Sequence, residues 1–304
     1  MSEARYRSLR ELPGVHALAA GTAMCAGCGG LEALHEVLDV LGTRTVVINA
    51  AGCMTLLASY PFTPFHGSWL YTSMASAPAG AQGVRDALDL LRSRGRIGAD
   101  DDLTAVVLSG DGSAYGMGLS ATSAAIERGL DFIYLCYDNE GYGNTGQQTS
   151  AATPHGARTP TSPGPAGHAG EKKDLFDVWV AHRPRYAATV IGAEPLDLAR
   201  KVQRAASLAG PRLILALAPC PTGWDYDPMH GVDIGRLAVR TGIWPLKEYV
   251  DGAVVHTHVP HPRLPVEAYL STQGRFRHLF EPLRNDALIG EIQQRVDRYW
   301  QNVG

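Results

Sequence analysis

Four of the five cysteines have a spacing that could hold a metal ion or a cluster. Cys25 and Cys28 form a Cys-x-x-Cys pair beside glycines, Cys53 follows Gly52, and Cys220 lies between two prolines. A four-cysteine iron–sulfur cluster needs four converging thiolates, and glycines let a loop curl around it. The same residues would also suit a Cys-x-x-Cys redox or zinc site, or could be unrelated buried cysteines. The cysteine pattern alone leaves these alternatives open.

Six residues in the middle of the chain have the types and spacing of a diphosphate and magnesium site. Glycines let backbone N–H groups approach a diphosphate closely, and the start of a following helix favours its negative charge. Mg²⁺ prefers oxygen ligands, which Asp111, Asn139 and the backbone carbonyl of Gly141 can supply. A lone Gly-Asp-Gly is usually only a turn, but the two segments together predict a thiamine-diphosphate–magnesium motif. The full set is Gly110, Asp111, Gly112, Ser113, Asn139 and Gly141.

Both candidate sites follow apolar runs that predict buried strands. Nearly continuous apolar runs of this length are typical of a parallel sheet that is covered on both faces. They are Thr45–Asn49, Thr104–Leu108, Phe132–Tyr137 and Arg212–Leu217. Helical patterns lie between them, at residues 30–41, 78–94, 116–129 and 195–208. The alternation predicts a doubly wound, mostly parallel α/β fold, in which ligands bind at the carboxyl ends of the strands.

The chain is expected to divide into two parts. Residues 1–220 would form an α/β domain that binds thiamine diphosphate and the cluster. Residues 221–304 would form a C-terminal arm and a closing amphipathic helix, packed on the domain or on a partner subunit. The arm has weak periodicity over residues 221–283, whereas residues 150–173, rich in Pro, Gly, Ser and Thr, predict a long loop over a site.

Other cysteine, lysine and histidine residues could also bind a metal or a cofactor, but the sequence gives a simpler explanation for each. Cys136 lies in the middle of an apolar run, so we expect it in the core. Lys172 and Lys173 could meet an anionic cofactor, but an exposed helix start is the simpler expectation. His256 and His258 have no third ligand at useful spacing, so we do not expect them to bind a metal.

Composition and charge exclude several classes of protein. The 304 residues are 45% hydrophobic and 19% charged, which is ordinary for a folded protein. A net charge of −3 gives no electrostatic case for nucleic-acid binding, and five cysteines are too few for a disulfide scaffold. The first residues show no signal peptide, and no apolar run is long enough to span a membrane. We therefore expect a cytoplasmic protein whose reduced cysteines are available as ligands.

These motifs resemble the β subunit of the 2-oxoacid:ferredoxin oxidoreductases, the family of pyruvate synthase. The matching segments run from near the start of the chain to near its end, so the resemblance covers almost the whole sequence. They are Cys25–Gly29, Gly52–Cys53, Gly110–Leu119, Tyr137–Gly146, Ala218–Trp224 and Pro265–Phe276. One departure is Gly30, where many relatives carry a larger or acidic residue.

The resemblance implies a role for each candidate residue. The four cysteines would hold one [4Fe–4S] cluster close to thiamine diphosphate, and Gly110 to Ser113 would hold the diphosphate. Mg²⁺ would bind to Asp111, Asn139 and the carbonyl of Gly141, while Asn144 would face the reacting carbon. The cluster ligands would be Cys25, Cys28, Cys53 and Cys220.

The resemblance also implies a reaction and partner subunits. The family's β subunit carries only the diphosphate-binding half of the thiamine site, and the α subunit carries the pyrimidine-binding half with its activating glutamate. A 2-oxoacid, pyruvate by default, would lose CO₂ and pass electrons singly to the cluster, and coenzyme A would take the acyl group. Electrons would leave through γ and ferredoxin-like δ subunits, or an equivalent subunit, to ferredoxin or an NAD-linked acceptor.

Two other functions fit parts of the sequence. A non-oxidative thiamine enzyme, such as a decarboxylase, would explain Asp111 and Asn139 but not four cysteines. A zinc-stapled partner subunit without catalytic activity would explain the cysteines but would leave the segment from Asp111 to Asn144 without a role. Within the oxidoreductases, branched-chain oxoacids, 2-oxoglutarate and aryl oxoacids remain alternatives to pyruvate, because the substrate pocket is shared with another subunit.

Overall fold

An eight-stranded sheet organises the chain in a computed structural model that describes residues 6–14, 16–98 and 103–303. Residues 1–5, on which the expectation of no signal peptide partly rests, lie outside this range. The strand order is β2-β1-β3-β4-β6-β5-β7-β8, parallel from β2 to β5 and antiparallel from there to β8. The strands are β1 Thr45–Ala50, β2 Ser68–Thr72, β3 Thr104–Gly110, β4 Phe132–Asp138, β5 Tyr186–Ile191, β6 Pro211–Leu217, β7 Leu246–Val250 and β8 Ala253–His258.

The four strands expected from apolar runs are confirmed as β1, β3, β4 and β6, and they are neighbours in the sheet. Every residue of β4 and β6 is buried, because helices cover both faces of the sheet. Cys136 lies in β4 and is fully buried, as expected. The sequence did not reveal β2, a half-exposed edge strand, or β5, whose alanine-rich run is short.

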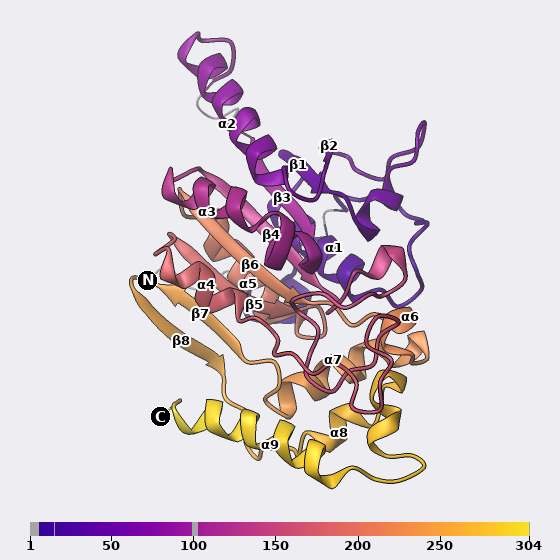
Figure 1. The fold of residues 1–304 in the computed structure, drawn as a ribbon. Coiled ribbons are helices and arrows are strands. Elements are labelled where there is room, and N and C mark those ends of the chain that lie inside the picture. Colours follow the sequence, from indigo (N-terminus) through magenta and orange to yellow (C-terminus); the bar gives the residue numbers. More distant parts are fainter. Residues whose placement is uncertain (1–5, 15, 99–102, 304) are drawn as a thin grey trace.

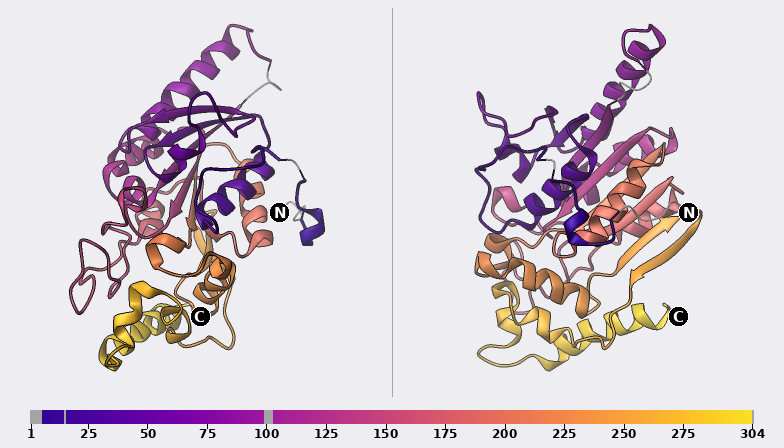
Figure 2. Two further views of the ribbon diagram at one scale, coloured as in Figure 1. Left: turned by 90° about the vertical axis from the view of Figure 1, so that its right-hand side faces the viewer. Right: turned by 180° about the vertical axis from the view of Figure 1, so that it is seen from behind.

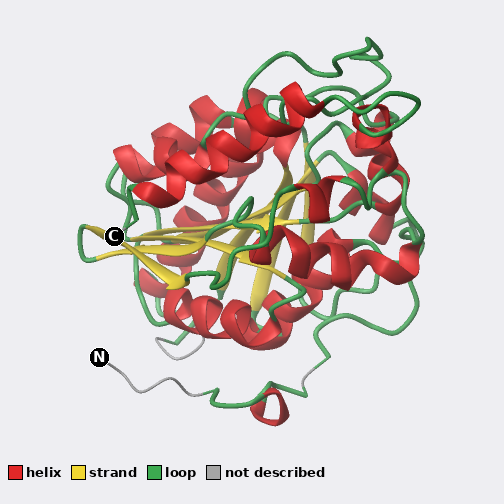
Figure 3. Ribbon diagram, turned by 90° about the horizontal axis from the view of Figure 1, so that it is seen from below, coloured by secondary structure: helices red, strands yellow, loops and turns green. Residues whose placement is uncertain are grey.

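Helices form a layer on each face of the sheet (Figures 1 and 3). One face is covered by α1 and α5, whose Leu34 and Leu198 enter one core cluster. The other face is covered by α2, α3 and α4, which bury Ala81, Ile126 and Trp179 in a second cluster. These helices are α1 Gly29–Leu41, α2 Ala77–Ser93, α3 Leu119–Glu127, α4 Leu175–Ala181 and α5 Pro195–Ala206.

The expected helix over residues 116–129 begins differently from its sequence pattern. A π-helical turn, Gly112–Met117, follows Asp111 directly, and α3 starts only at Leu119. The N–H of Gly118 donates to the carbonyl of Ser113 at 2.7 Å, which closes the wide turn. Such turns are rare and often occur at functional sites.

The segment after residue 220 is more regular than its weak periodicity suggested. It holds α6 Pro221–Trp224, α7 Gly231–Arg240, β7, β8, α8 Glu267–Leu270 and α9 Asp286–Gln301. Strand β7 pairs with β5, so this segment joins the sheet of the α/β domain by main-chain hydrogen bonds. The last helices gather below the sheet, opposite the projecting end of α2 (Figures 1 and 2). A domain boundary at residue 220 stays a prediction.

Short 3₁₀ helices complete the regular structure. They are Leu9–Glu11, Cys53–Leu57, Gly143–Thr145, Pro228–His230 and Gly274–Leu279. Residues 150–173 contain neither helix nor strand, as the sequence predicted. In the described residues, no helix has both the length and the apolar character needed to cross a membrane.

Candidate active site

Four candidate residues follow the carboxyl ends of four adjacent strands. Cys53 follows β1, Asp111 follows β3, Asn139 follows β4 and Cys220 follows β6. The register aligns these ends, because Gly110 of β3 pairs with Tyr137 of β4, and the last residue of β4 pairs with the last residue of β6. The parallel sheet therefore gathers residues that are far apart in the sequence at one edge.

The four candidate cysteines line one cavity of about 290 Å³, which we call the cysteine cavity. Cys28 caps α1, and the N–H of Gly29 donates to the carbonyl of Pro219 at 3.0 Å, which joins the Cys-x-x-Cys loop to the Cys220 segment. Gly27 has φ of +68°, and a β-carbon there would lie 2.6 Å from the carbonyl oxygen of Pro228. The Cys-x-x-Cys loop therefore requires glycine at residue 27.

The sulfur atoms of the cysteine cavity are too far apart for a compact zinc site. Among the described residues, one group of three or more His, Cys, Asp or Glu has all its ligand atoms within 4.8 Å of one another, and it contains no cysteine. All four cysteines lie in the described part, so no three of their sulfurs are that close. A tetrahedral zinc site, with Zn–S bonds of about 2.3 Å, would hold its sulfurs about 3.8 Å apart.

Burial disfavours the ionised form of three thiols in the cysteine cavity, those of Cys28, Cys53 and Cys220. Burial, followed by the nearby Cys220 and Cys28, raises the pKa of Cys53 to about 12. Burial also raises the pKa of Cys28 and of Cys220. The N–H of Gly223 lies 3.3 Å from the sulfur of Cys220 and favours its thiolate. A cationic centre in the cavity would stabilise the thiolates of these three buried cysteines.

Three residues that carry an oxygen ligand converge beside the cysteine cavity. One terminal atom of the Asn139 side-chain amide lies 2.8 Å from Oδ1 of Asp111 and 2.7 Å from the carbonyl oxygen of Gly141. As nitrogen, this atom donates a hydrogen bond to both oxygens, whereas as oxygen it completes a set of three ligands for a cation. Oxygens around an octahedral Mg²⁺ with bonds of about 2.0–2.1 Å lie about 2.9 Å apart. We call Asp111, Asn139 and the Gly141 carbonyl the three-oxygen site.

The surrounding residues hold the three-oxygen site in place. The backbone carbonyl of Asn139 accepts two hydrogen bonds, one from the indole N–H of Trp224 at 2.9 Å and one from the side-chain amide of Gln147 at 3.1 Å. Ser150, in the long loop, donates its hydroxyl to Oδ2 of Asp111 and leaves Oδ1 facing the site. A β-carbon at Gly143 would lie 2.5 Å from the amide nitrogen of Asn139. The position of the Asn139 side chain therefore depends on the glycine at residue 143.

Asp111 is a buried carboxyl in a negative environment. Burial, and then the neighbouring Asp138, raises the pKa of Asp111 well above its ordinary value of 3.8. Ser150 and Lys172 oppose this shift only in part. Without a cation, the ionised form of Asp111 is thus disfavoured, and a divalent ion beside it would reverse the balance.

A buried ion network supports the loop that carries Asn139. Glu140, with φ of +62°, forms ion pairs with Lys172 and Arg275 at 2.7 Å each. Lys172 also contacts Asp138 at 2.7 Å. Burial opposes ionisation of Glu140, but Lys172 and Arg275 outweigh it and lower its pKa. We call Asp138, Glu140, Lys172 and Arg275 the buried ion network.

The buried ion network corrects the expectation for the two lysines. Lys172 and Lys173 are not on an exposed helix start, because both amines point inward, that of Lys173 to the carbonyl of Tyr115. The helix α4 does start there, capped by Asp174. Arg275 also stacks 3.9 Å above the ring of Trp224. The sequence analysis did not predict the buried ion network. The one local indication was the pair of acidic residues on either side of Asn139, Asp138 and Glu140.

The structure places the other candidate residues around the same edge. Gly110 and Gly112 lie against the rings of Tyr137 and Tyr142, where a side chain would collide. The hydroxyl of Ser113 donates to the carbonyl of Met74, so only its backbone N–H is free to face a ligand. Asn144 is exposed and lines the cysteine cavity.

Gly30 lines the floor of the cysteine cavity. A β-carbon at this position would lie 2.9 Å from the terminal methyl of Met54 and 3.4 Å from the β-carbon of Tyr137. The space next to this glycine is thus filled by Met54. Many relatives carry a larger or acidic residue at this position. In this chain the flexible side chain of Met54 takes up the room that such a residue would need.

The fold and the site define a thiamine diphosphate enzyme domain. Residues 50–216 match the family model described as the thiamine pyrophosphate enzyme, C-terminal TPP binding domain. Pyruvate synthase subunit PorB from Methanocaldococcus jannaschii is 40% identical over 97% of this chain and 98% of its own. Subunit VorB of ketoisovalerate oxidoreductase from Pyrococcus horikoshii is 39% identical over 93% of this chain and 91% of its own.

The fold also has a counterpart among solved structures. A 2-oxoglutarate:ferredoxin oxidoreductase from Magnetococcus marinus, solved with 2-oxoglutarate, coenzyme A and succinyl-CoA, has a TM-score of 0.58 and 20% identity. The similarity covers 78% of this chain and 84% of that chain, and it shows the fold. With the relatives above, it confirms the α/β thiamine-diphosphate fold. The chain belongs to the β subunits of the 2-oxoacid:ferredoxin oxidoreductases.

Proposed function

We propose that this β subunit holds the diphosphate half of a thiamine diphosphate site, one Mg²⁺ and one [4Fe–4S] cluster. The reaction would be oxidative decarboxylation of a 2-oxoacid to acyl-CoA and CO₂. The single observation that carries this proposal is the three-oxygen site beside four cysteines, at the carboxyl ends of adjacent strands. Burial raises the pKa of Asp111 and of Cys28, Cys53 and Cys220, and a cationic centre beside each group would favour its ionised form.

Magnesium fits the three-oxygen site by distance and by ligand type. With the amide oxygen of Asn139 turned toward Asp111 and Gly141, the separations of 2.7 and 2.8 Å are close to those in an octahedral Mg²⁺ shell. One carboxylate, one amide and one carbonyl leave positions for phosphate oxygens and water, which is the usual composition of such sites. Backbone N–H groups of Gly110 to Ser113, at the start of the π-helical turn, would bind the diphosphate.

An iron–sulfur cluster fits the cysteine cavity better than a single ion. Cys25, Cys28, Cys53 and Cys220 share one cavity, but no three of their sulfurs lie within 4.8 Å of one another. A cluster of eight atoms is larger than one zinc ion and requires more widely spaced thiolates. Gly143 lies between the two sites, since a β-carbon there would be 3.4 Å from the sulfur of Cys53 as well as against Asn139.

The chain's own residues would position the reactants. Bound thiamine diphosphate supplies an electron sink for the loss of CO₂ from a 2-oxoacid. Asn144 is exposed at the cysteine cavity and would offer a polar contact at the reacting carbon. The buried ion network would keep Asn139 in place, and the thiolates would keep the cluster near enough to accept single electrons.

The proposal requires partner subunits. We assign the pyrimidine-binding half of the site to an α subunit, and onward electron transfer to γ and ferredoxin-like δ subunits or an equivalent, ending on ferredoxin or an NAD-linked acceptor. Large apolar side chains are exposed on the loop before β2, on β2 and on the π-helical turn, where an α subunit would cover them. They are Leu56, Tyr60, Phe62, Leu70, Tyr71 and Met117.

Coenzyme A would accept the acyl group, and pyruvate is the default substrate. Branched-chain, 2-oxoglutarate and aryl oxoacids are the alternatives, because this chain supplies only part of the pocket. We also propose a cytoplasmic location, where the cysteines remain reduced until the cluster is assembled.

The deciding experiment is anaerobic viologen reduction by the native complex that contains this chain. A panel of 2-oxoacids is tested with and without coenzyme A. Reduction that depends on coenzyme A and on one oxoacid supports the proposal and names the substrate. No reduction by any oxoacid, from a preparation replete in iron and thiamine diphosphate, contradicts it. Metal analysis separates the alternatives: iron with sulfide favours the oxidoreductase, and zinc favours a non-catalytic scaffold.

A further inference from the structure

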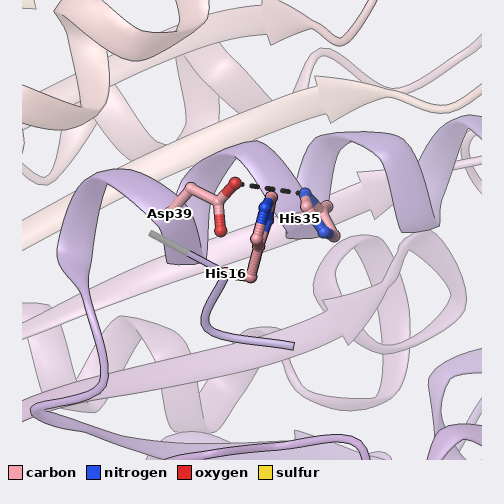
Figure 4. A group of neighbouring side chains, drawn as sticks. All are labelled: His16, His35 and Asp39. Carbon is pink, nitrogen blue, oxygen red and sulfur yellow. Dashed lines mark ion pairs between the residues drawn. The ribbon is translucent and has the colours of Figure 1, made fainter. Parts of the chain in front are cut away.

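Two histidines and an aspartate come together beside α1 (Figure 4), and none of the three lines the cysteine cavity. His35 and Asp39 are one turn apart on α1, and His16 comes from the N-terminal segment that runs beside the helix. One ligand atom from each residue lies within 4.8 Å of the other two. Neither the thiamine site nor the cluster uses these side chains.

The distance between His35 and Asp39 suits two ligands of one ion. Nδ1 of His35 lies 3.3 Å from Oδ2 of Asp39. That distance is beyond the usual 2.7–3.2 Å of an N–H···O hydrogen bond. Two ligands of a tetrahedral zinc ion, with bonds of about 2.0–2.2 Å, lie about 3.4 Å apart. Both side chains come from consecutive turns of one helix, so the helix itself fixes their separation.

Main-chain hydrogen bonds bring the third ligand to this pair. The N–H of Ala17 donates to Oδ1 of Asp39 at 3.2 Å, so that oxygen orients the carboxylate while Oδ2 faces the histidines. Ala17 and Ala19 also bond to His66 and Pro64, at 3.1 and 2.7 Å. The segment that carries His16 is therefore bonded to α1 on one side and to residues 64–66 on the other. The ring centroids of His16 and His35 are 6.0 Å apart.

We propose that His16, His35 and Asp39 bind one Zn²⁺ ion, with water in the remaining position. Two imidazoles and a carboxylate suit zinc, whereas Mg²⁺ prefers an all-oxygen shell. The ion links the N-terminal segment to α1. Because that segment continues into the Cys25 loop and α1 begins directly after Cys28, the ion holds both ends of the Cys-x-x-Cys loop to one rigid element.

The test uses the complete complex with its cluster in place, so that the four cysteines are occupied. Zinc is titrated anaerobically against a chromophoric chelator. We expect one zinc ion per β subunit, bound at least about tenfold more weakly by His35→Ala and by Asp39→Asn. Asp39→Asn keeps an oxygen acceptor for Ala17, so weaker binding there reports the lost ligand rather than misfolding. His258→Ala, on exposed β8, is the matched control and should bind zinc as the wild type does.

Two further measurements separate this site from the cysteines. Cobalt bound in place of zinc should show ligand-field bands without a thiolate charge-transfer band. Zinc should slow amide hydrogen exchange in residues 16–24 of the wild type but not of Asp39→Asn. The proposal is overturned by the absence of a stoichiometric site, by binding unchanged in both variants, or by a thiolate band with cobalt. None of these outcomes depends on activity, so the proposed reaction and this site can fail separately.

Discussion

Replacing Asp111 by asparagine should stabilise the cofactor-free chain and weaken its cofactor site. Asp111 is only 1% exposed, and burial with the neighbouring Asp138 raises its pKa. An amide of the same shape would still accept from Ser150 through one atom. The Asn139 amide, 2.8 Å from the present Oδ1, can hydrogen-bond to an aspartate or to an asparagine at residue 111. The gain therefore comes from removing a buried carboxyl whose ionised form is disfavoured.

The size of the gain follows from these contacts. Removing an uncompensated buried polar group relieves about 1–3 kcal/mol. We expect Asp111→Asn to raise the unfolding free energy of the cofactor-free chain by about 1–3 kcal/mol, and its Tm by roughly 2–6 °C. Because the folded-state pKa of Asp111 is raised, the wild type loses stability as pH rises above 3.8. The advantage of the variant should therefore grow over that range.

The cofactor-bound state should respond in the opposite direction. Asp111 is the only carboxylate of the three-oxygen site, so its loss should raise the Kd for Mg²⁺–thiamine diphosphate at least about tenfold. At a concentration of about 100 times the wild-type Kd, ligand binding stabilises the wild type by about 2.7 kcal/mol. The variant would gain only about 1.4 kcal/mol under the same conditions.

Thermal unfolding with EDTA, and with Mg²⁺ and thiamine diphosphate, measures both effects. Cofactor affinity in the assembled complex is measured by tryptophan fluorescence. Asp86→Asn, an exposed carboxyl on α2, is the matched control and should change neither quantity. A variant that binds the cofactor as tightly as the wild type would refute the three-oxygen site. A cofactor-free variant less stable than the wild type would refute the account of the buried carboxyl.

Four further predictions follow from the site. Lys172→Met leaves two buried carboxylates without their shared partner and should lower the unfolding free energy by about 3–5 kcal/mol, measured by urea unfolding; a loss below 1 kcal/mol would contradict the buried ion network. The added methyl group of Gly143→Ala pushes against the Asn139 amide and should weaken Mg²⁺–thiamine diphosphate binding. The control Gly83→Ala places its methyl group in open space on α2 and should raise the unfolding free energy by about 0.5–1 kcal/mol. Cys220→Ala should lose iron and sulfide, and unchanged iron content would remove this cysteine from the ligand set. Asn144→Ala should lower turnover more than cofactor affinity, and equal losses of both would argue against its catalytic role.

Much of the fold could be predicted because its strands are locally encoded. β1, β3, β4 and β6 each contain a run of large apolar residues, so each can be predicted without its neighbours. β2 and β5 could not be predicted in this way. β2 becomes a strand by pairing with β1 at the edge of the sheet, and β5 has two alanines after its first residue and only two large aliphatic residues, at its end. β7 depends on pairing with β5, far away in the sequence.

The sequence by itself determined which residue types are present for chemistry and which strand each one follows. The glycine turn after β3 and the amide after β4 are local features, as is the Cys-x-x-Cys pair. Only the tertiary structure decided how these residues meet. The parallel order of four strands brings Cys53, Asp111, Asn139 and Cys220 to one edge of the sheet. The inward turn of Lys172 and the approach of Arg275 were equally hidden, because a charge is buried only where distant segments supply its partner.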